Sequence, residues 1–515
     1  MANDVIFNKG QSGLGRPLAG TDYVSGMLFY SATLPSGFSS SDRIKIVYSV
    51  EEAEDLGIVD TCADATASTA TFQVTNKGAV GDTHVLTCAI IDSVNPTPSK
   101  SALGTVTLAS YTQVTADVTS TSTAADRLAA EINLGTPTHG FTAVANTATV
   151  TITAPKNQGV FLNSGTPYVS TTTGTLAGTL TQNVVAGVAS EIAIMHYHVS
   201  EFFRIQPKGK LYIDIEATAD ATTFAKVTTL QNFAQGEIKQ LGIYQKTTAF
   251  ATSQTTTLQA VLDALETNHK TISSVLYQAE FSGTSDLTTL ANTKLLSNKN
   301  VSVCLGQDGD NVGFRLWKAT NKSIGCMGTM LGAVALAKVN ESIAWIAKFN
   351  VSAAEYDVLA FANGNLYTSI SDGNLVNLEN FGYNYLKKFV GLTGSYFTKP
   401  NTCIAATSDY TYIYNNRVID KAIRGLRTFL LPSLASPLTV NADGTLSETT
   451  IGYFNSLCDR ALEVMQRDNE LSAFLVTIDP SQDVLTDNEL TIAVKLVPVG
   501  VADTITVNIG FALSI

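Results

Sequence analysis

The sequence predicts an α/β (α+β) multidomain chain that carries an inserted all-β, sandwich-like domain and extended terminal β-arms. Three observations predict this class. Strand-like and helix-like segments alternate over residues 26–60 and 189–405, which is typical of an α/β layer. Between them, residues 61–188 are dominated by threonine, serine, alanine, valine and glycine in short alternating runs. Within a predicted C-terminal arm of residues 501–515, residues 504–515 alternate apolar with small or polar positions, as a strand with one buried face does.

Length and composition limit the kind of protein. A chain of 515 residues is long enough for two to four domains. The net charge of −12 argues against nucleic acid or an anionic membrane as the main partner, because both favour clustered lysine and arginine. No apolar run approaches the roughly 18 residues of a membrane span, so no direct membrane insertion is expected.

The first residues, "MANDVIFNKGQSG", lack the basic stretch and apolar run of a secretory signal, so we expect the chain to be made and first folded in a cytoplasm. Residues 1–25 predict an extended N-terminal arm with a short apolar alternation at Val5 and Phe7. The cysteines lack CxxC spacing, which indicates buried free thiols rather than a zinc site or a disulfide framework. They are Cys62, Cys88, Cys304, Cys326, Cys403 and Cys458.

The α/β elements lie on both sides of the threonine-rich block. Before it, "YVSGMLFY" and "IKIVYSV" predict strands and "EEAEDLG" a helical turn. After it, "SEIAIMHYHVSEFFRI" and "TTLQAVLDALETNHK" have helical periodicity, while "KLYIDIEA", "SSVLYQAEF" and "VSVCLG" read as strands. The apolar segment "GTMLGAVALAKV" follows. The pattern indicates one α/β layer that the block interrupts as an insertion.

The block itself repeats short alternating runs such as "TATFQVT", "THVLTCAI" and "TATVTITA", with one helical patch, "AADRLAAEINL". Strands at this spacing predict a small β-sandwich or barrel. A disordered threonine-rich linker is the alternative, and the regular β-branched alternation argues against it.

Residues 406–515 begin with two helices, "YIYNNRVIDKAIRGLRTFLL" and "SETTIGYFNSLCDRALEVMQR". In the second, Ser447 is the predicted N-cap. One apolar stripe follows at Ile451, Phe454, Leu457, Ala461, Leu462 and Met465. The segment "LTIAVKLVPVGVADTITVNIGFALSI" then predicts a strand, a Pro-Gly turn and a final strand. The pattern leaves open whether this last strand pairs with another subunit or folds back onto "LTIAVKL".

Motifs of catalysis and cofactor binding do not occur: GxxxxGK[ST], GxSxG and HExxH are absent, and the glycines of "GQSGLGRP" lack a preceding strand and a following helix. We therefore expect no enzyme, no catalytic or cofactor-binding residue and no cofactor. The loop "QDGDNVG" places Asp308 and Asp310 like the first two ligands of a calcium loop. Val312 and Ala319 occupy the fifth and twelfth positions, so a Gly-Asp turn is favoured.

Two further groups of polar residues have simple spacings. His196 and His198 are two residues apart on a predicted helix, so they point to different faces and cannot jointly hold a metal. Arg417, Lys421 and Arg424 share one helical face. That face is either solvated or in contact with an acidic partner.

Four segments carry a resemblance to a known family. They are "GLGRPLAGTDYVSGMLFY", "HYHVSEFFRIQPKGKLYIDI", "DYTYIYNNRVIDKAIRGLR" and "LSAFLVTIDPSQDVLTDNELTIAVKLVPVGVADTITVNIGF". The chain resembles the tail-sheath-like proteins of contractile phage tails and related injection systems. The resemblance covers most of the chain except roughly residues 61–188. Its most specific part is "VTIDPSQDVL" followed by "PVGVADTITVNIGF".

The resemblance implies a structural contractile tail sheath subunit. Such subunits polymerise with themselves, in stacked hexameric rings, as a helical sleeve around an inner tail tube protein. Baseplate and tail terminator proteins are the further partners implied. The sleeve contracts to drive the tube through a target cell envelope. The implied location is a virion tail or an extracellular injection particle, assembled in the bacterial host cytoplasm.

The resemblance also implies α/β domains of sheath type, with an outward-facing insertion and arms that add strands to neighbouring subunits. The inter-subunit strand would then contain Ile505, Val507, Ile509, Phe511 and Leu513, with Val5 and Phe7 in the N-terminal arm. If the partner of the basic helical face is an acidic tube, Arg417, Lys421 and Arg424 are its candidate tube-facing residues.

Two other classes of protein compete with this interpretation. The threonine-rich region would suit a secreted or surface β-rich adhesin or carbohydrate-binding protein, which predicts a monomer with a secretion signal. An enzyme with an unrecognised site predicts a cluster of acid, base and nucleophile.

Overall fold

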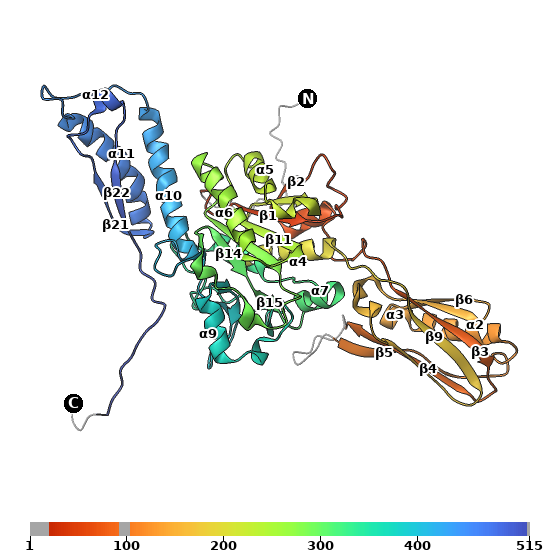
Figure 1. Cartoon of the computed structure of the whole chain (residues 1–515). Coiled ribbons are helices and arrows are strands. Elements are labelled where there is room, and N and C mark those ends of the chain that lie inside the picture. The colour runs from red at the N-terminus through yellow and green to blue at the C-terminus, as the bar shows by residue number, and fades with distance from the viewer. Residues whose placement is uncertain (1–19, 92–102, 512–515) are drawn as a thin grey trace, which may run out of the picture.

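The computed structural model describes residues 20–91 and 103–511 (Figure 1). They form three bodies in a row: an α/β core, an insertion of residues 61–188 at one end, and a C-terminal module of residues 406–511 at the other. Val5, Phe7 and Leu513, which the sequence places in terminal arms, lie outside the described residues.

A seven-stranded sheet forms the centre of the core, in the order β17-β14-β12-β11-β1-β10-β2. Every neighbouring pair is parallel except β10 and β2. The predicted α/β character is confirmed. The strands are β1 (Ser25–Tyr30), β2 (Ile44–Val47), β10 (Leu211–Glu216), β11 (Gln240–Ala249), β12 (Ser274–Glu280), β14 (Val301–Cys304) and β17 (Tyr383–Asn384).

Helices cover both faces of this sheet, as a parallel sheet requires. On β1, Met27 and Phe29 point into one hydrophobic cluster, while Leu28 and Tyr30 point into the other. The first cluster contains side chains of α1 (Val50–Asp55), α4 (Ile192–Ile205), α7 (Val312–Thr320) and α8 (Met327–Leu336). The second contains side chains of α5 (Lys226–Phe233), α6 (Thr252–Thr267) and α9 (Asp372–Asn380).

Short antiparallel pairs complete the core around this sheet. They are β13 (Ser297–Asn298) with β20 (Cys403–Ile404), β15 (Gly306–Asp308) with β16 (Leu359–Phe361), and β18 (Leu386–Lys387) with β19 (Tyr396–Phe397).

The insertion contains two antiparallel sheets, in the orders β6-β7-β3-β9 and β5-β4-β8. Its strands are β3 (Thr69–Lys77), β4 (Thr83–Ile91), β5 (Leu103–Thr112), β6 (Thr142–Asn146), β7 (Thr149–Thr153), β8 (Tyr168–Thr172) and β9 (Leu176–Val185), and its helices are α2 (Thr121–Leu134) and α3 (Thr136–His139).

The insertion is not all-β, which corrects the prediction. Helix α2 buries Ala125, Leu128 and Ile132 in the same cluster as Phe72 and Val150 of the sheets. The helix therefore belongs to the hydrophobic core of the insertion, because small and aliphatic side chains on one of its faces fill the space beside the strands.

The chain enters and leaves the insertion at one place. Thr66 and Val188 form an isolated antiparallel bridge, with both N–H to O=C distances at 3.0 Å. On the core side, Phe314 and Ala319 of α7 pack against Ile91 of the insertion. The backbone N–H of Val160 in the insertion also donates to the carbonyl of Ala319, at 2.8 Å. The insertion is thus joined to the core by two adjacent chain segments and by a small contact with α7.

The C-terminal module consists of α10 (Ile413–Leu430), α11 (Glu448–Arg467), the short α12 (Val484–Asp487) and a hairpin of β21 (Leu471–Thr477) and β22 (Ala493–Pro498). The predicted N-cap is confirmed, since the Ser447 side chain accepts from the backbone N–H of Thr450. Of the predicted stripe on α11, Phe454, Ala461, Leu462 and Met465 are buried, while Ile451 and Leu457 are partly buried.

Residues 501–511 contain no strand, although the sequence predicts one there. Strand β22 pairs with β21 and not with the segment that follows it. The alternative that this last segment folds back onto "LTIAVKL" is therefore wrong for the isolated chain. In Figure 1 the segment runs away from the hairpin without a neighbouring strand.

Candidate functional site: an unpaired C-terminal segment beside an open hairpin

The apolar side chains of residues 504–511 lie in solvent. The exposed fractions are 80% for Ile505, 70% for Val507, 91% for Ile509 and 111% for Phe511. In globular proteins, such contiguous apolar exposure marks a contact site. In the isolated chain, the four described apolar side chains of the predicted inter-subunit strand are therefore unburied.

The hairpin of the C-terminal module is itself only half covered. Its inner face carries Phe474, Val476, Val494 and Leu496, which pack partly buried against a cluster that contains Val418 and Leu462 of the helices. Among the described residues, β21 and β22 pair only with each other. A two-stranded sheet is marginally stable alone, and each strand offers one edge for a further strand.

The outer face of the hairpin is also apolar in part. Leu475 is 57% exposed and Val497 51% exposed. The hairpin therefore combines exposed apolar side chains with unpaired strand edges, the combination that soluble monomers normally avoid.

The predicted basic face of α10 lies within the molecule. Arg417 is only 3% exposed, which corrects its placement on a free surface. Its guanidinium donates to the carbonyl oxygens of Ala337 and Lys338, both at 3.1 Å. It also donates to the carbonyl of Asp22 at 3.3 Å. The side chain is thus used in joining the core to the C-terminal module.

Lys421 and Arg424 of the same helix are also paired inside the chain. Lys421 Nζ lies 2.8 Å from Asp22 Oδ2 and 2.6 Å from Glu470 Oε1. Arg424 Nη2 lies 2.5 Å from Asp22 Oδ1. Both basic side chains keep about a quarter of their surface exposed, so a further contact to a partner is not sterically blocked.

The electrostatics of this cluster follow from burial and charge. Burial alone would raise the pKa of Asp22, but the hydrogen bond and charge of Lys421, with Arg424 and Arg417 nearby, hold it below its usual value. Burial lowers the pKa of Arg417 to about 10. The cluster therefore holds a carboxylate among three cations at neutral pH.

Sequence reasoning missed Asp22, Glu470 and the pair of Lys399 with Asp503, whose Nζ and Oδ2 atoms lie 3.3 Å apart. No periodic pattern marks these acids. The available signal was indirect: three cations on one face of a helix require counter-ions if the helix packs against the rest of the chain.

The loop that resembles a calcium site has a structural role. Both oxygens of Asp308 accept from backbone N–H groups: Oδ2 from Asn311 and Phe314, and Oδ1 from Tyr356. Burial raises the pKa of Asp308 to about 6. The carboxyl fixes the first turn of α7, in line with the favoured turn.

The two histidines of α4 have different surroundings, as their spacing predicts. His196 Nε2 lies 2.9 Å from Glu54 Oε1. His198 is buried, and burial lowers its pKa to about 3. Within the described ranges, no three histidine, cysteine, aspartate or glutamate side chains come close enough to share a metal ion.

The described cysteines are free thiols, five of them buried and Cys62 half-buried. The helices of residues 20–91 and 103–511 include none with the length and apolar content of a membrane span.

The fold and this site define a class: a large α/β chain with a separate C-terminal module and an exposed apolar segment beside an open hairpin. The chain belongs to the DUF2586 family. The model of its N-terminal domain matches residues 2–401, and the model of its C-terminal domain matches residues 409–515. The boundary between the two matches falls just before α10. No curated protein matches the chain in sequence.

Several solved structures are similar to the chain at low sequence identity. The helical sheath of the anti-feeding prophage in its contracted state is 16% identical, over 62% of this chain and 81% of that one, with a TM-score of 0.42. The contracted PVC sheath complex of an extracellular contractile injection system is 14% identical, over 62% and 80%, with a TM-score of 0.41. The sheath tail protein Lin1278 from Listeria innocua is 11% identical, over 94% and 96%, with a TM-score of 0.38.

Proposed function

We propose that the chain is a structural sheath subunit that polymerises as a helical sleeve, and that it is not an enzyme. The observation that carries the proposal is the exposed, alternating apolar segment of residues 504–511. The resemblance of "VTIDPSQDVL" and "PVGVADTITVNIGF" to the tail-sheath-like family supports it. The adhesin alternative gives no role to this segment.

The energetics favour burial of the segment in another subunit. Complete burial of Ile505, Val507, Ile509 and Phe511 contributes at most about 1.5–3 kcal/mol each. Each new ladder hydrogen bond adds about 0.5–1.5 kcal/mol. Ordering of the segment on binding opposes part of this gain. The sum still favours a stable link between subunits.

The hairpin of β21 and β22 in a second copy is the proposed acceptor. Its outer face exposes Leu475 and Val497, and its edges lack strand partners among the described residues. Addition of a strand to such an edge uses main-chain hydrogen bonds for affinity and side-chain pockets for specificity.

The segment is long enough to reach another subunit. Residues 504–511 in a fully extended conformation span roughly 26 Å at 3.3 Å per residue. This length is several times the distance between neighbouring strands of a sheet. The segment can therefore extend from its own subunit to the hairpin of another.

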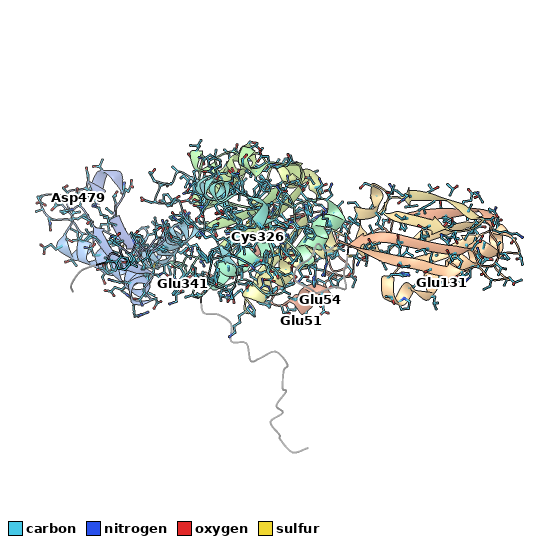
Figure 2. The ribbon with its side chains drawn as sticks, turned by 90° about the horizontal axis from the view of Figure 1, so that it is seen from below. Glu51, Glu54, Glu131, Cys326, Glu341 and Asp479 are labelled. Atoms are coloured by element: carbon cyan, nitrogen blue, oxygen red, sulfur yellow. The ribbon has the colours of Figure 1, made fainter. Side chains whose placement is uncertain are left out.

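The finer features of a contractile sheath belong to the same proposal. The sleeve surrounds an inner tail tube, meets baseplate and terminator proteins at its ends, and contracts, in a virion tail or an extracellular injection particle. Figure 2 places Asp479 of the C-terminal module and Glu131 of the insertion at opposite ends of the chain. With assembly at the C-terminal module, residues 61–188 would face outward as a separately folding domain.

Electron microscopy of the purified protein tests the proposal. A sheath subunit forms tubes of uniform width, whereas an adhesin or an enzyme stays monomeric or forms small oligomers. Absence of tubes over a wide range of protein and salt concentrations would contradict the sheath function.

Removal of the insertion tests the domain proposal separately. We expect a chain in which a short linker replaces residues 69–185 to form tubes still, because the bridge of Thr66 and Val188 closes the junction. Folded subunits that never assemble would show that the insertion takes part in polymerisation.

A further inference from the structure

We propose that ion pairs hold Asp22 and Asp503 in place, and that basic side chains on or next to α10 thereby set the directions in which the two terminal segments start. Asp22 and Asp503 are called the N-terminal root and the C-terminal root below. This inference rests on the proposed function, because direction matters only if the segments reach other subunits. It assigns positioning roles to Lys421, Arg424 and Lys399.

The first root is held from several sides. The two carboxylate oxygens of Asp22 contact different cations, Lys421 and Arg424, and its carbonyl accepts from Arg417. A residue fixed at both its side chain and its main chain cannot rotate without breaking several contacts. The chain preceding Asp22 therefore starts in a defined direction.

The same cluster joins three parts of the molecule. Arg417 reaches carbonyls of the core at Ala337 and Lys338, and Lys421 reaches Glu470 in the turn between α11 and β21. Asn340 of the core also donates to the carbonyl of Asn469 in that turn, at 3.0 Å. Glu341 lies where the core meets the C-terminal module in Figure 2. Asp22 is thus linked through these side chains to both the core and the C-terminal module.

The second root lies at the start of the same helix. Lys399 holds Asp503 at 3.3 Å and stands next to Pro400, whose carbonyl accepts from the backbone N–H of Ile413, the first residue of α10, at 3.0 Å. The charge of Asp503 also acts on Tyr412 and Tyr414. Asp22 and Asp503 therefore both lie beside α10.

The two roots differ in strength. Asp22 has two charged partners in a half-buried site, and such charge-assisted bonds are the stronger kind. Lys399 and Asp503 form one ion pair with about a third of each side chain exposed, and exposed pairs of this kind are weak. The N-terminal root is therefore rigid, while the C-terminal root guides its segment and can yield when subunits rotate.

The test compares Asp22→Asn and Asp503→Asn with the native protein in tube assembly. Asp468→Asn is the matched control, because Asp468 faces Arg467 on the same module at 3.8 Å and holds no terminal segment. We expect Asp22→Asn to reduce ordered tubes at least tenfold, Asp503→Asn to reduce them several-fold, and the control to behave as native. Exchange of the charges, Lys399→Asp with Asp503→Lys, should restore assembly.

A measurement on the monomer separates this inference from the sheath proposal. In a Cys62→Ser background, spin labels at Asp443→Cys and Phe511→Cys report the spread of distances between the module and the C-terminal segment. We expect Asp503→Asn to at least double the width of that distribution. If native protein forms no tubes, the sheath function fails. If neither substitution changes tube assembly, or if Asp503→Asn leaves the width of the distance distribution unchanged, the roots have no positioning role.

Discussion

Strand β12 and the segment of residues 504–511 have similar residue types, but one is buried and the other is exposed. Both are rich in residues that favour strands. All seven residues of β12 are buried, between β11 and β14 and beneath helices on both faces. The C-terminal segment has no strand neighbour in the described chain, and its apolar side chains are exposed.

The difference shows that the pattern of apolar residues specifies how many faces of a strand are buried. Whether the burial occurs within the chain or in another subunit depends on which strands are available to pair with it. Strand β12 requires cover on two faces, because its adjacent residues Leu276 and Tyr277 enter different hydrophobic clusters. The alternation of residues 504–511 requires cover on one face only. Substitutions in β12 should therefore act on folding, and substitutions in the C-terminal segment on assembly.

Truncation after Asp503 is expected to have the largest effect. Polymerisation should be lost at any accessible concentration, because the strand that joins subunits is absent. The melting temperature of the monomer should stay within about 2 °C of native, since no described contact of residues 504–511 stabilises the fold. Sedimentation and thermal melting of the truncated protein measure both. An unfolded or still polymerising truncated protein would contradict the inference that residues 504–511 act on assembly and not on folding.

Charges on one face of the segment are expected to have the next largest effect. Ile509→Lys with Phe511→Lys should prevent tube formation, because burial of unpaired charges in another subunit is costly. The matched control, Thr506→Lys with Asn508→Lys, changes the opposite face and should reduce assembly less. Light scattering during assembly measures the difference. Equal effects of both pairs would show that the segment does not bind through one face.

The corresponding change in the core should destabilise folding. Leu276→Ala removes a fully buried side chain from the cluster that contains α4 and α8. We expect a loss of about 2–5 kcal/mol in the free energy of unfolding. Denaturant unfolding of the assembly-deficient truncated chain measures this loss without interference from polymers. A loss under about 0.5 kcal/mol, as at surface positions, would contradict the assignment of β12 as a central strand.

The smallest expected effect is that of replacing a buried acid of the central sheet, and it concerns the pH dependence of stability. Asp214 of β10 is buried, and desolvation, with the charge of Glu216, raises its pKa to about 8. The folded state therefore keeps a proton that the unfolded state releases near pH 4, so the contribution of this group to stability is lost progressively as the pH rises from about 4 to about 8, and the loss is nearly complete above the folded-state pKa. Between pH 7 and 9 the loss is about 1 kcal/mol. In denaturant unfolding at pH 7 and pH 9, Asp214→Asn should remove this contribution of about 1 kcal/mol, while Asp468→Asn should leave it unchanged.

Local patterns predicted much of the fold correctly. The helical period and the cap at Ser447 identified α11, and short runs rich in apolar residues identified β1, β10, β12 and β14, because these signals lie within a few residues. The sequence did not predict β11, α7 and α9. Helix α2 was recognised as helical, but not as part of the hydrophobic core of the insertion.

The candidate site was predictable only in part. Alternation from Ile505 to Phe511 is a local signal, and it identified the exposed segment. The ion cluster of α10 is not local: Arg417 and Asp22 are 395 positions apart. Spacing alone showed that Arg417, Lys421 and Arg424 share a face, and could not show that the chain's own acids cover it. Pairing across such a separation follows from the tertiary fold.

The bridge between Thr66 and Val188 has a practical consequence for engineering. Because the chain enters and leaves the insertion through two neighbouring residues, another compact domain with adjacent termini can replace it without separating the strands of the core. An enzyme, an epitope or a fluorescent reporter grafted there would be carried once per subunit. The junction therefore makes the chain a candidate scaffold for displaying foreign proteins in a regular array.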